Sequence, residues 1–231
     1  MKRMFAILAA MLAFGIPSLG QLPGNPENWC RGGFFTSESD LFRIGVVNGS
    51  KGSKAYFYND DKEDCPSGRG CRGKAYLVPG DEVIVNREYR GYACGWFTNA
   101  AGKTTVGWLD ARHLDFPERL IDASANAWSG EWYYAENSIE LAPEGNGWLR
   151  VKGNAFWRGL GDNIHIGELD GRAAPEGGIL EYSDGDDEYD CKATMRFLGS
   201  FLIVADNQKC GGANVSFSGV YSRNKPQINS R

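Results

Sequence analysis

Short stretches rich in hydrophobic residues recur between polar segments in the first half of this chain. The stretches cover residues 44–47, 54–58, 74–78, 82–86, 91–97 and 103–109. Short hydrophobic stretches of this kind predict strands, and the stretch 82–86 is read as alternating with a period of two. Turn-forming residues separate the stretches, for example Pro79-Gly80-Asp81. Short strands at close spacing predict a small barrel between residues 44 and 116.

The second half repeats this pattern with longer strands. We expect about eight, at 128–133, 138–142, 148–157, 163–171, 179–183, 191–198, 201–206 and 215–223. The segment Phe217-Ser-Gly-Val-Tyr221 echoes Trp128-Ser-Gly-Glu-Trp132. This echo predicts that the first and last strands pair to close an antiparallel barrel, which leaves room for packed side chains or one small ligand.

The predicted fold class is therefore all-β, with two barrels in sequence. The stretch 117–127 is rich in small, polar and proline residues, as expected of a linker. We expect an N-terminal arm at 21–43, a first domain at 44–116, a second at 128–224 and a tail at 225–231.

The first twenty residues have the pattern of a secretory signal peptide. Lys2 and Arg3 precede an apolar run at 4–16, and small residues before Gln21 predict cleavage after Gly20. The run is too short to span a membrane, and no second apolar stretch follows. We expect a mature protein of about 211 residues, periplasmic or secreted.

All six cysteines lie beyond the predicted cleavage site, and an even number in an exported chain predicts disulfides. Fifteen pairings exist, and the sequence does not choose among them. Loop lengths favour Cys65 with Cys71 across one turn and Cys191 with Cys210 across one hairpin, which leaves Cys30 with Cys94. A zinc site is the competing interpretation, but it lacks a C-x-x-C motif, and both histidines are distant from any cysteine pair.

Charge bears on the choice of partners. The mature chain has a net charge of about −6 and no run of Lys or Arg. Nucleic acid and anionic membranes are bound through basic patches, so neither is an expected partner. A basic protein is electrostatically acceptable.

Motifs in the first barrel resemble those of the bacterial SH3-like (SH3b) domain. The matching segments are A-Y-F-Y at 55–58, K-A-Y-L-V-P-G-D-E-V at 74–83 and G-K-T-T-V-G-W-L-D-A-R-H-L at 102–114. They span about 70 residues. The chain departs from the family at Tyr92, where a Trp is usual, and at Cys94, where an apolar residue is usual.

The resemblance implies a binding module for peptides, including those of the cell wall. Transferred residue by residue, it makes Tyr56, Tyr58, Tyr92 and Trp108 the candidate ligand-binding residues. Aromatic faces give a large contact area at low entropic cost. Alternation also allows Tyr56 and Trp108 to be core residues, whereas Tyr58 and Tyr92 are expected at the surface.

The second barrel resembles lipocalin-like and avidin-like barrels in one motif, Gly130-Glu131-Trp132 in its first strand. Its ending, N-V-S-F-S-G-V-Y, resembles that of uncharacterised exported bacterial proteins. Neither resemblance implies a chemical activity.

Catalytic and metal-binding motifs are sparse. The sequence contains no G-x-S-x-G, H-E-x-x-H or P-loop motif. His165 and Glu168 would face opposite sides of a strand. The acidic run at 184–190 has oxygen ligands that suit Ca²⁺, but it lacks the features of an EF-hand, so a solvated loop is the favoured interpretation. We expect no catalytic residues, metal or cofactor.

These features predict an exported, non-catalytic binding protein of the bacterial envelope that recognises a peptide or peptidoglycan. The alternative is an inhibitor or immunity factor against a basic secreted hydrolase such as lysozyme, bound through the acidic loop. A third hypothesis, a cell-wall hydrolase, requires a nucleophile or paired carboxylates that the sequence does not show.

Overall fold

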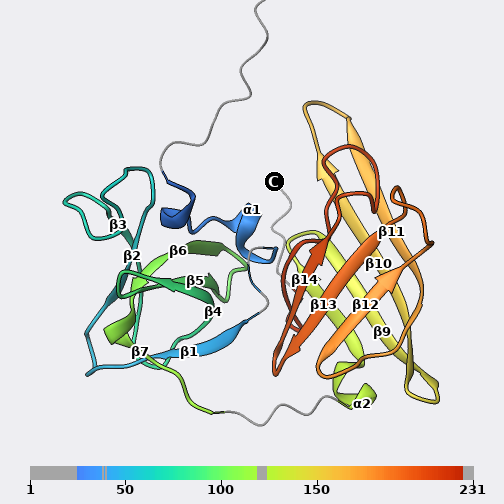
Figure 1. Ribbon diagram of the computed structural model, residues 1–231, viewed down its shortest axis with the longest axis horizontal. Coiled ribbons are helices and arrows are strands. Elements are labelled where there is room, and N and C mark those ends of the chain that lie inside the picture. Colours follow the sequence, from blue (N-terminus) through green and yellow to red (C-terminus); the bar gives the residue numbers. More distant parts are fainter. Residues whose placement is uncertain (1–24, 38, 40, 119–123, 226–231) are drawn as a thin grey trace, which may run out of the picture.

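The computed structural model describes residues 25–37, 39, 41–118 and 124–225. The predicted signal peptide, its cleavage site and part of the predicted linker lie outside these residues. Figure 1 shows two β structures, a curled seven-stranded sheet and a nearly closed eight-stranded barrel. The all-β prediction is confirmed, whereas the SH3b relationship of the first half stays a prediction.

The curled sheet is antiparallel throughout, in the order β3-β2-β6-β5-β4-β1-β7. Its strands are β1 (Arg43–Val47), β2 (Ala55–Tyr58), β3 (Arg72–Leu77), β4 (Glu82–Tyr89), β5 (Tyr92–Thr98), β6 (Thr104–Asp110) and β7 (Leu114–Asp115). The helical turns η1 (Pro26–Asn28) and α1 (Gly32–Phe35) precede it, and η2 (Ala111–His113) joins β6 to β7.

The inner face of this sheet forms a small core. Its buried residues include Phe57, Val83 and Leu109. Successive side chains of a strand point to opposite faces, so the residues next to each of these point to the outer face. The predicted turn at 79–81 is present. Gly80 has φ +93°, which a glycine tolerates without strain, and the Val78 amide donates to the Asp81 carboxylate at 2.8 Å.

The barrel contains all eight predicted strands with shifted ends. They are β8 (Gly130–Tyr134), β9 (Asn137–Gly145), β10 (Trp148–Arg158), β11 (Ile164–Ala173), β12 (Ile179–Ser183), β13 (Lys192–Leu198), β14 (Phe201–Asp206) and β15 (Gly219–Ser222). A short helix, α2 (Ala125–Trp128), occupies the start of the predicted first strand. The strand order is β11-β10-β9-β8-β15-β14-β13-β12.

The first and last strands pair, as predicted, with Tyr133 opposite Ser222. The remaining gap lies between β11 and β12, and side chains and a loop bridge it. The Asp170 amide donates to the Tyr182 hydroxyl at 3.1 Å. The Gly212 amide donates to the Ile166 carbonyl at 3.2 Å. These contacts across the gap cover strand edges that would otherwise be open to pairing.

Large side chains fill the barrel interior. Trp132, Phe217 and Tyr221 are fully buried there, in a cluster to which all eight strands and their connections contribute residues. The Tyr221 hydroxyl donates to the Phe217 carbonyl at 2.8 Å, so its polar atom is satisfied inside an apolar core.

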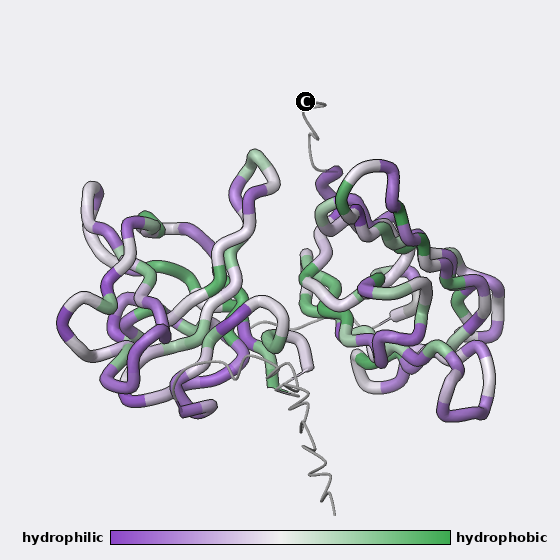
Figure 2. The backbone as a smooth tube through the Cα atoms, turned by 90° about the horizontal axis from the view of Figure 1, so that it is seen from above, coloured by the Kyte–Doolittle hydropathy of each residue, from purple (hydrophilic) through white to green (hydrophobic). Residues whose placement is uncertain are grey.

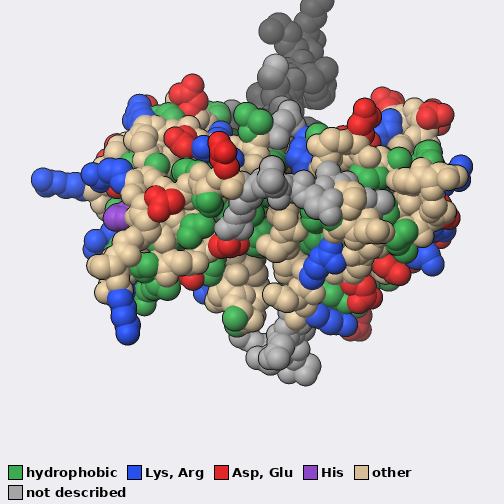
Figure 3. Space-filling view, turned by 90° about the horizontal axis from the view of Figure 1, so that it is seen from below, with side chains coloured by type: hydrophobic (Ala, Val, Ile, Leu, Met, Phe, Trp, Pro, Cys, Tyr) green, Lys and Arg blue, Asp and Glu red, His purple; other side chains and the backbone are tan. Residues whose placement is uncertain are grey.

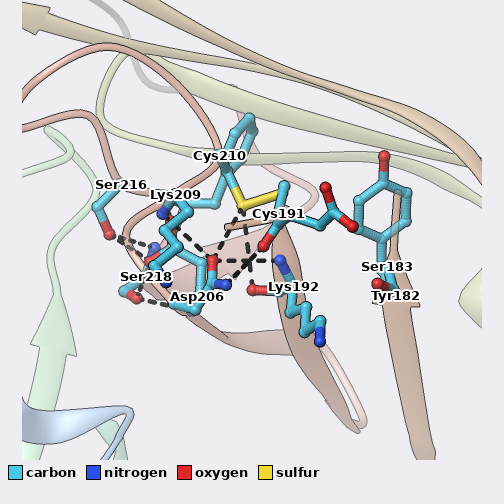
Figure 4. The surroundings of a disulfide bond; sticks show 12 residues. Tyr182, Ser183, Cys191, Lys192, Asp206, Lys209, Cys210, Ser216 and Ser218 are labelled. Atoms are coloured by element: carbon cyan, nitrogen blue, oxygen red, sulfur yellow. Dashed lines mark hydrogen bonds between the residues drawn. A yellow bond between two sulfur atoms is a disulfide. The ribbon is translucent and has the colours of Figure 1, made fainter. Parts of the chain in front are cut away.

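The three disulfides are those that loop length favoured: Cys30–Cys94, Cys65–Cys71 and Cys191–Cys210. Figure 4 shows the last of these beside the loop that connects β14 to β15. The carboxylate of Asp206 fixes this loop. It accepts from the hydroxyls of Ser216 at 2.7 Å and Ser218 at 2.6 Å, and from the Phe217 amide at 3.0 Å.

The two halves share a hydrophobic cluster. Ile203 and Val220 lie on the outer face of the barrel, yet both are buried, because they pack in one cluster with Ile84 and Trp96 of the curled sheet. The Trp96 ring lies 5.5 Å from that of Tyr134, centroid to centroid. Figure 2 shows the halves side by side, with hydrophobic stretches of each facing the other. The arrangement is therefore a packed contact between two folded units.

Candidate functional site

An aromatic surface lies on the outer face of the curled sheet, opposite its small core. Tyr58 on β2 and Tyr92 on β5 are half-buried, and their rings meet edge to face at 5.1 Å. Strand β6 lies between β2 and β5, so the two rings approach each other over it. Two of the four predicted binding residues thus form a pair.

Trp108 lies beside this pair and is fully buried. It is opposite Tyr58 in the β2–β6 ladder and opposite Cys94 in the β5–β6 ladder. Its indole N–H donates to the Asn28 carbonyl at 2.7 Å. Of the two roles left open for Trp108, the structure places it as a buried residue of the hydrophobic cluster on this outer face, against which both tyrosines pack.

The N-terminal arm covers Trp108 and is fixed at several points. Cys30 is bonded to Cys94. The Cys30 amide and the Arg31 Nε each donate to the Asp60 carboxylate at 2.9 Å. This arm covers part of the outer face, whereas Tyr58 and Tyr92 stay half-buried.

Tyr56, the fourth predicted residue, is two positions before Tyr58 and so shares its outward direction. It is half-buried, and its ring lies 5.7 Å from that of Tyr76, which is 45% exposed. The Arg72 guanidinium lies 4.7 Å from the Tyr56 ring, and the Lys54 ammonium 4.0 Å from the Tyr76 ring. Sequence reasoning missed Tyr76, although its alternation within K-A-Y-L could have pointed to it.

Charged groups border the Tyr58–Tyr92 pair. The Arg112 Nη2 donates to the Asp110 carboxylate at 2.6 Å, and this hydrogen bond lowers the pKa of Asp110. Burial raises the pKa of Tyr92, and the neighbouring Tyr58 and Asp110 raise it further. The Tyr92 hydroxyl therefore stays protonated at neutral pH. The surface offers ring faces, hydroxyl donors and guanidinium groups, which suit recognition of an extended polar chain.

The other residues singled out from the sequence are elsewhere. The His165 ring is tilted against that of Trp157, with centroids 5.1 Å apart, and its Nδ1 contacts the Ala213 carbonyl. Glu168 is exposed and points to the opposite side of β11, as expected. The other histidine of the chain, His113, lies in the helical turn η2, where its carbonyl accepts from the backbone amide of Asn48 at 2.9 Å.

The acidic loop at 184–190 connects β12 to β13 and is mostly exposed. It is ordered from within, since the Asp187 amide donates to the Asp190 carboxylate at 2.7 Å. Tyr189, at 76% exposure, is next to these carboxylates.

One group in the described residues has the atoms and proximity of a metal site: Asp64 with Cys65 and Cys71. Both sulfurs belong to the Cys65–Cys71 disulfide, so neither is a thiolate that could bind a metal.

No protein-family model, curated protein or solved structure matches the chain. Within the part of the chain that the structure describes, no helix is both long and apolar enough to cross a bilayer.

Proposed function

We propose that this chain is an exported binding protein whose aromatic surface holds an extended peptide, such as the stem peptide of bacterial peptidoglycan. The observation that carries the proposal is the Tyr58–Tyr92 pair, whose half-buried rings pack against the cluster that contains Trp108. Tyrosines held rigidly in this way lose little entropy on binding, which favours affinity.

The disulfides support a location outside the cytoplasm. Three pairs are formed, and the described residues contain no free cysteine. Such bonds persist in oxidising compartments, including the periplasm and the extracellular space. The peptide chemistry itself is an expectation from the SH3b resemblance, which the tyrosine pair makes testable.

The test is co-sedimentation of the mature protein with purified peptidoglycan sacculi. We expect the wild type to sediment, and the double variant Tyr58→Ala/Tyr92→Ala to bind about tenfold more weakly, since an aromatic anchor typically contributes 1–2 kcal/mol. Tyr189→Ala is the matched control, because it removes an exposed tyrosine from the other half and should bind as the wild type does. Sedimentation no greater than that of an unrelated protein would rule out the proposal.

A second candidate is inhibition of a basic secreted hydrolase. The acidic loop favours it, since exposed carboxylates precede Tyr189 in the sequence, and Tyr189 is an exposed aromatic residue of the kind that anchors protein interfaces. Figure 3 shows acidic and basic side chains interspersed over the face seen from below.

For this candidate we expect inhibition of a lysozyme-type enzyme that weakens steeply with salt. The variant Asp186→Asn/Asp187→Asn should lose it, and Tyr58→Ala/Tyr92→Ala should keep it. This role would be excluded if the protein did not inhibit the enzyme, or if inhibition did not change with salt concentration.

A further inference from the structure

A cleft of about 410 Å³ opens where the two halves meet. One wall is the turn after β5, with Thr98 and Asn99. The other comes from the barrel, with Tyr134, Phe201 and Val220. Its volume is in the range of small-molecule sites, which often form at such junctions.

The barrel wall of this cleft is rigid. The ring of Tyr134 lies 5.5 Å from that of Trp96 in the curled sheet and 5.6 Å from that of Tyr221 inside the barrel. Gly219 allows this arrangement, because a Cβ at that position would clash with the Tyr134 ring. The cleft is therefore preformed, which lowers the entropic cost of binding.

The polar groups that line the cleft are either neutral or positively charged. Its lining residues include Asn99, Ser222, Asn224 and Lys225. Among the described residues, no Asp or Glu lines the cleft and Lys225 is the one charged residue that does, although acidic residues outnumber basic ones in the chain. Its ammonium group lies 5.5 Å from the Tyr133 ring. Glu131 is nearby and accepts from the Tyr133 hydroxyl, so that hydroxyl is already engaged.

We propose that the cleft binds one sugar ring that carries a carboxylate. The apolar side of a sugar ring packs on aromatic faces, because its C–H groups are attracted to the negative face of the ring system. The sugar hydroxyls match the amides of Asn99 and Asn224 and the hydroxyl of Ser222. The carboxylate matches Lys225 through a charge-assisted hydrogen bond.

This site is separate from the tyrosine surface. It uses the end of β5 with the turn after it and the strands β8, β14 and β15, whereas Tyr58 and Tyr92 lie beside the N-terminal arm on the outer face of β2 and β5. The proposal therefore does not rest on peptide binding, and either can fail alone.

The test is isothermal titration calorimetry of the mature protein with four monosaccharides. We expect N-acetylmuramic acid or glucuronic acid to bind at least tenfold more tightly than its neutral counterpart, N-acetylglucosamine or glucose. Preference for the muramic acid would identify a cell-wall source, and preference for the glucuronic acid an acidic polysaccharide. Absence of binding by both acids would overturn the proposal.

Three variants locate the binding. Lys225→Gln should remove the preference for the acid over its neutral counterpart. Lys209→Gln is the matched control. Lys209 belongs to the loop between β14 and β15, far from the cleft, and its ammonium lies 4.9 Å from the Tyr189 ring. Ala100→Trp should block binding of every sugar, because Ala100 is an exposed turn residue of the cleft wall. Acid binding that survives both Lys225→Gln and Ala100→Trp, in variants with wild-type circular dichroism, would refute the site.

Discussion

The buried hydroxyl of Tyr221 makes the stability of the barrel depend on pH. Its side chain is fully buried, and its hydroxyl donates to the carbonyl of Phe217, four residues earlier. Burial raises the pKa of this hydroxyl far above its ordinary value of 10.0, since a phenolate there would have no solvent. The folded state therefore binds this proton more tightly than the unfolded state.

This linkage predicts a stability loss at alkaline pH. The contribution of Tyr221 is fully present below about pH 10 and declines as the pH rises further, because only the unfolded state then ionises. We expect Tyr221→Phe to be less stable by about 1–2 kcal/mol at pH 8, where it leaves the Phe217 carbonyl without a partner. Its stability should fall less than that of the wild type between about pH 10 and pH 12. Urea unfolding at each pH measures both effects, and equal declines in the two proteins would contradict the assignment.

At the scale of elements, the sequence predicted the positions of the strands better than the contacts between strands that are distant in the sequence. All eight barrel strands and the pairing of β8 with β15 followed from alternation and from the repeated aromatic-Ser-Gly motif. The gap between β11 and β12 did not follow from either of these patterns. Contacts such as that of Asp170 with Tyr182 depend on the way the sheet curls, which no local pattern records.

The candidate site shows the same limit. Tyr58 and Tyr92 were expected at the surface, and both are half-buried. Alternation left Trp108 undecided, because the residue that covers it, Asn28, is 80 positions away in the sequence. Ile203 faces outwards from its strand and is nevertheless buried, because the other half of the molecule covers it.

The arm provides a prediction at this scale. Loop entropy makes the Cys30–Cys94 bond, with a separation of 64, contribute about 4 kcal/mol, against about 2 kcal/mol for Cys65–Cys71, with a separation of 6. We expect Cys30→Ala/Cys94→Ala to be the less stable double variant in urea unfolding. It should also show greater quenching of tryptophan fluorescence by acrylamide, since the arm no longer holds Trp108 away from solvent. The Cys65→Ala/Cys71→Ala variant is the control, and equal quenching in the two would argue against the covering role of the arm.

At the scale of the whole molecule, the shared cluster makes the two halves one cooperative unit. Ile203 and Val220 are opposite each other in the β14–β15 ladder, and both pack in the cluster that includes Trp96. Unfolding one half would expose this apolar surface on the other, so we expect a single transition for the wild type.

Ile203→Asp tests this coupling. The new carboxylate would be buried between the halves without a partner, which is strongly unfavourable. The barrel interior stays intact, because the neighbouring Leu202 and Val204 fill it. We expect two calorimetric transitions in place of one and a larger radius of gyration by X-ray scattering. Ile179→Asp, on the solvent-exposed outer face of the same barrel, should behave as the wild type. A single, unsplit transition in Ile203→Asp would show that the halves do not depend on this contact.

The adjacency of β8 and β15 has a consequence for how the barrel can be rewired. The backbone enters and leaves it through neighbouring strands, so a short linker from residue 225 to residue 124 could join the two ends. New ends could then be placed in the exposed turn that follows β10, where Leu160 is 98% exposed. Every ladder would be kept, including that between β10 and β11, while the covalent tether to the curled sheet would be lost. Such a circular permutant would isolate the contribution of noncovalent contact alone to holding the two halves together.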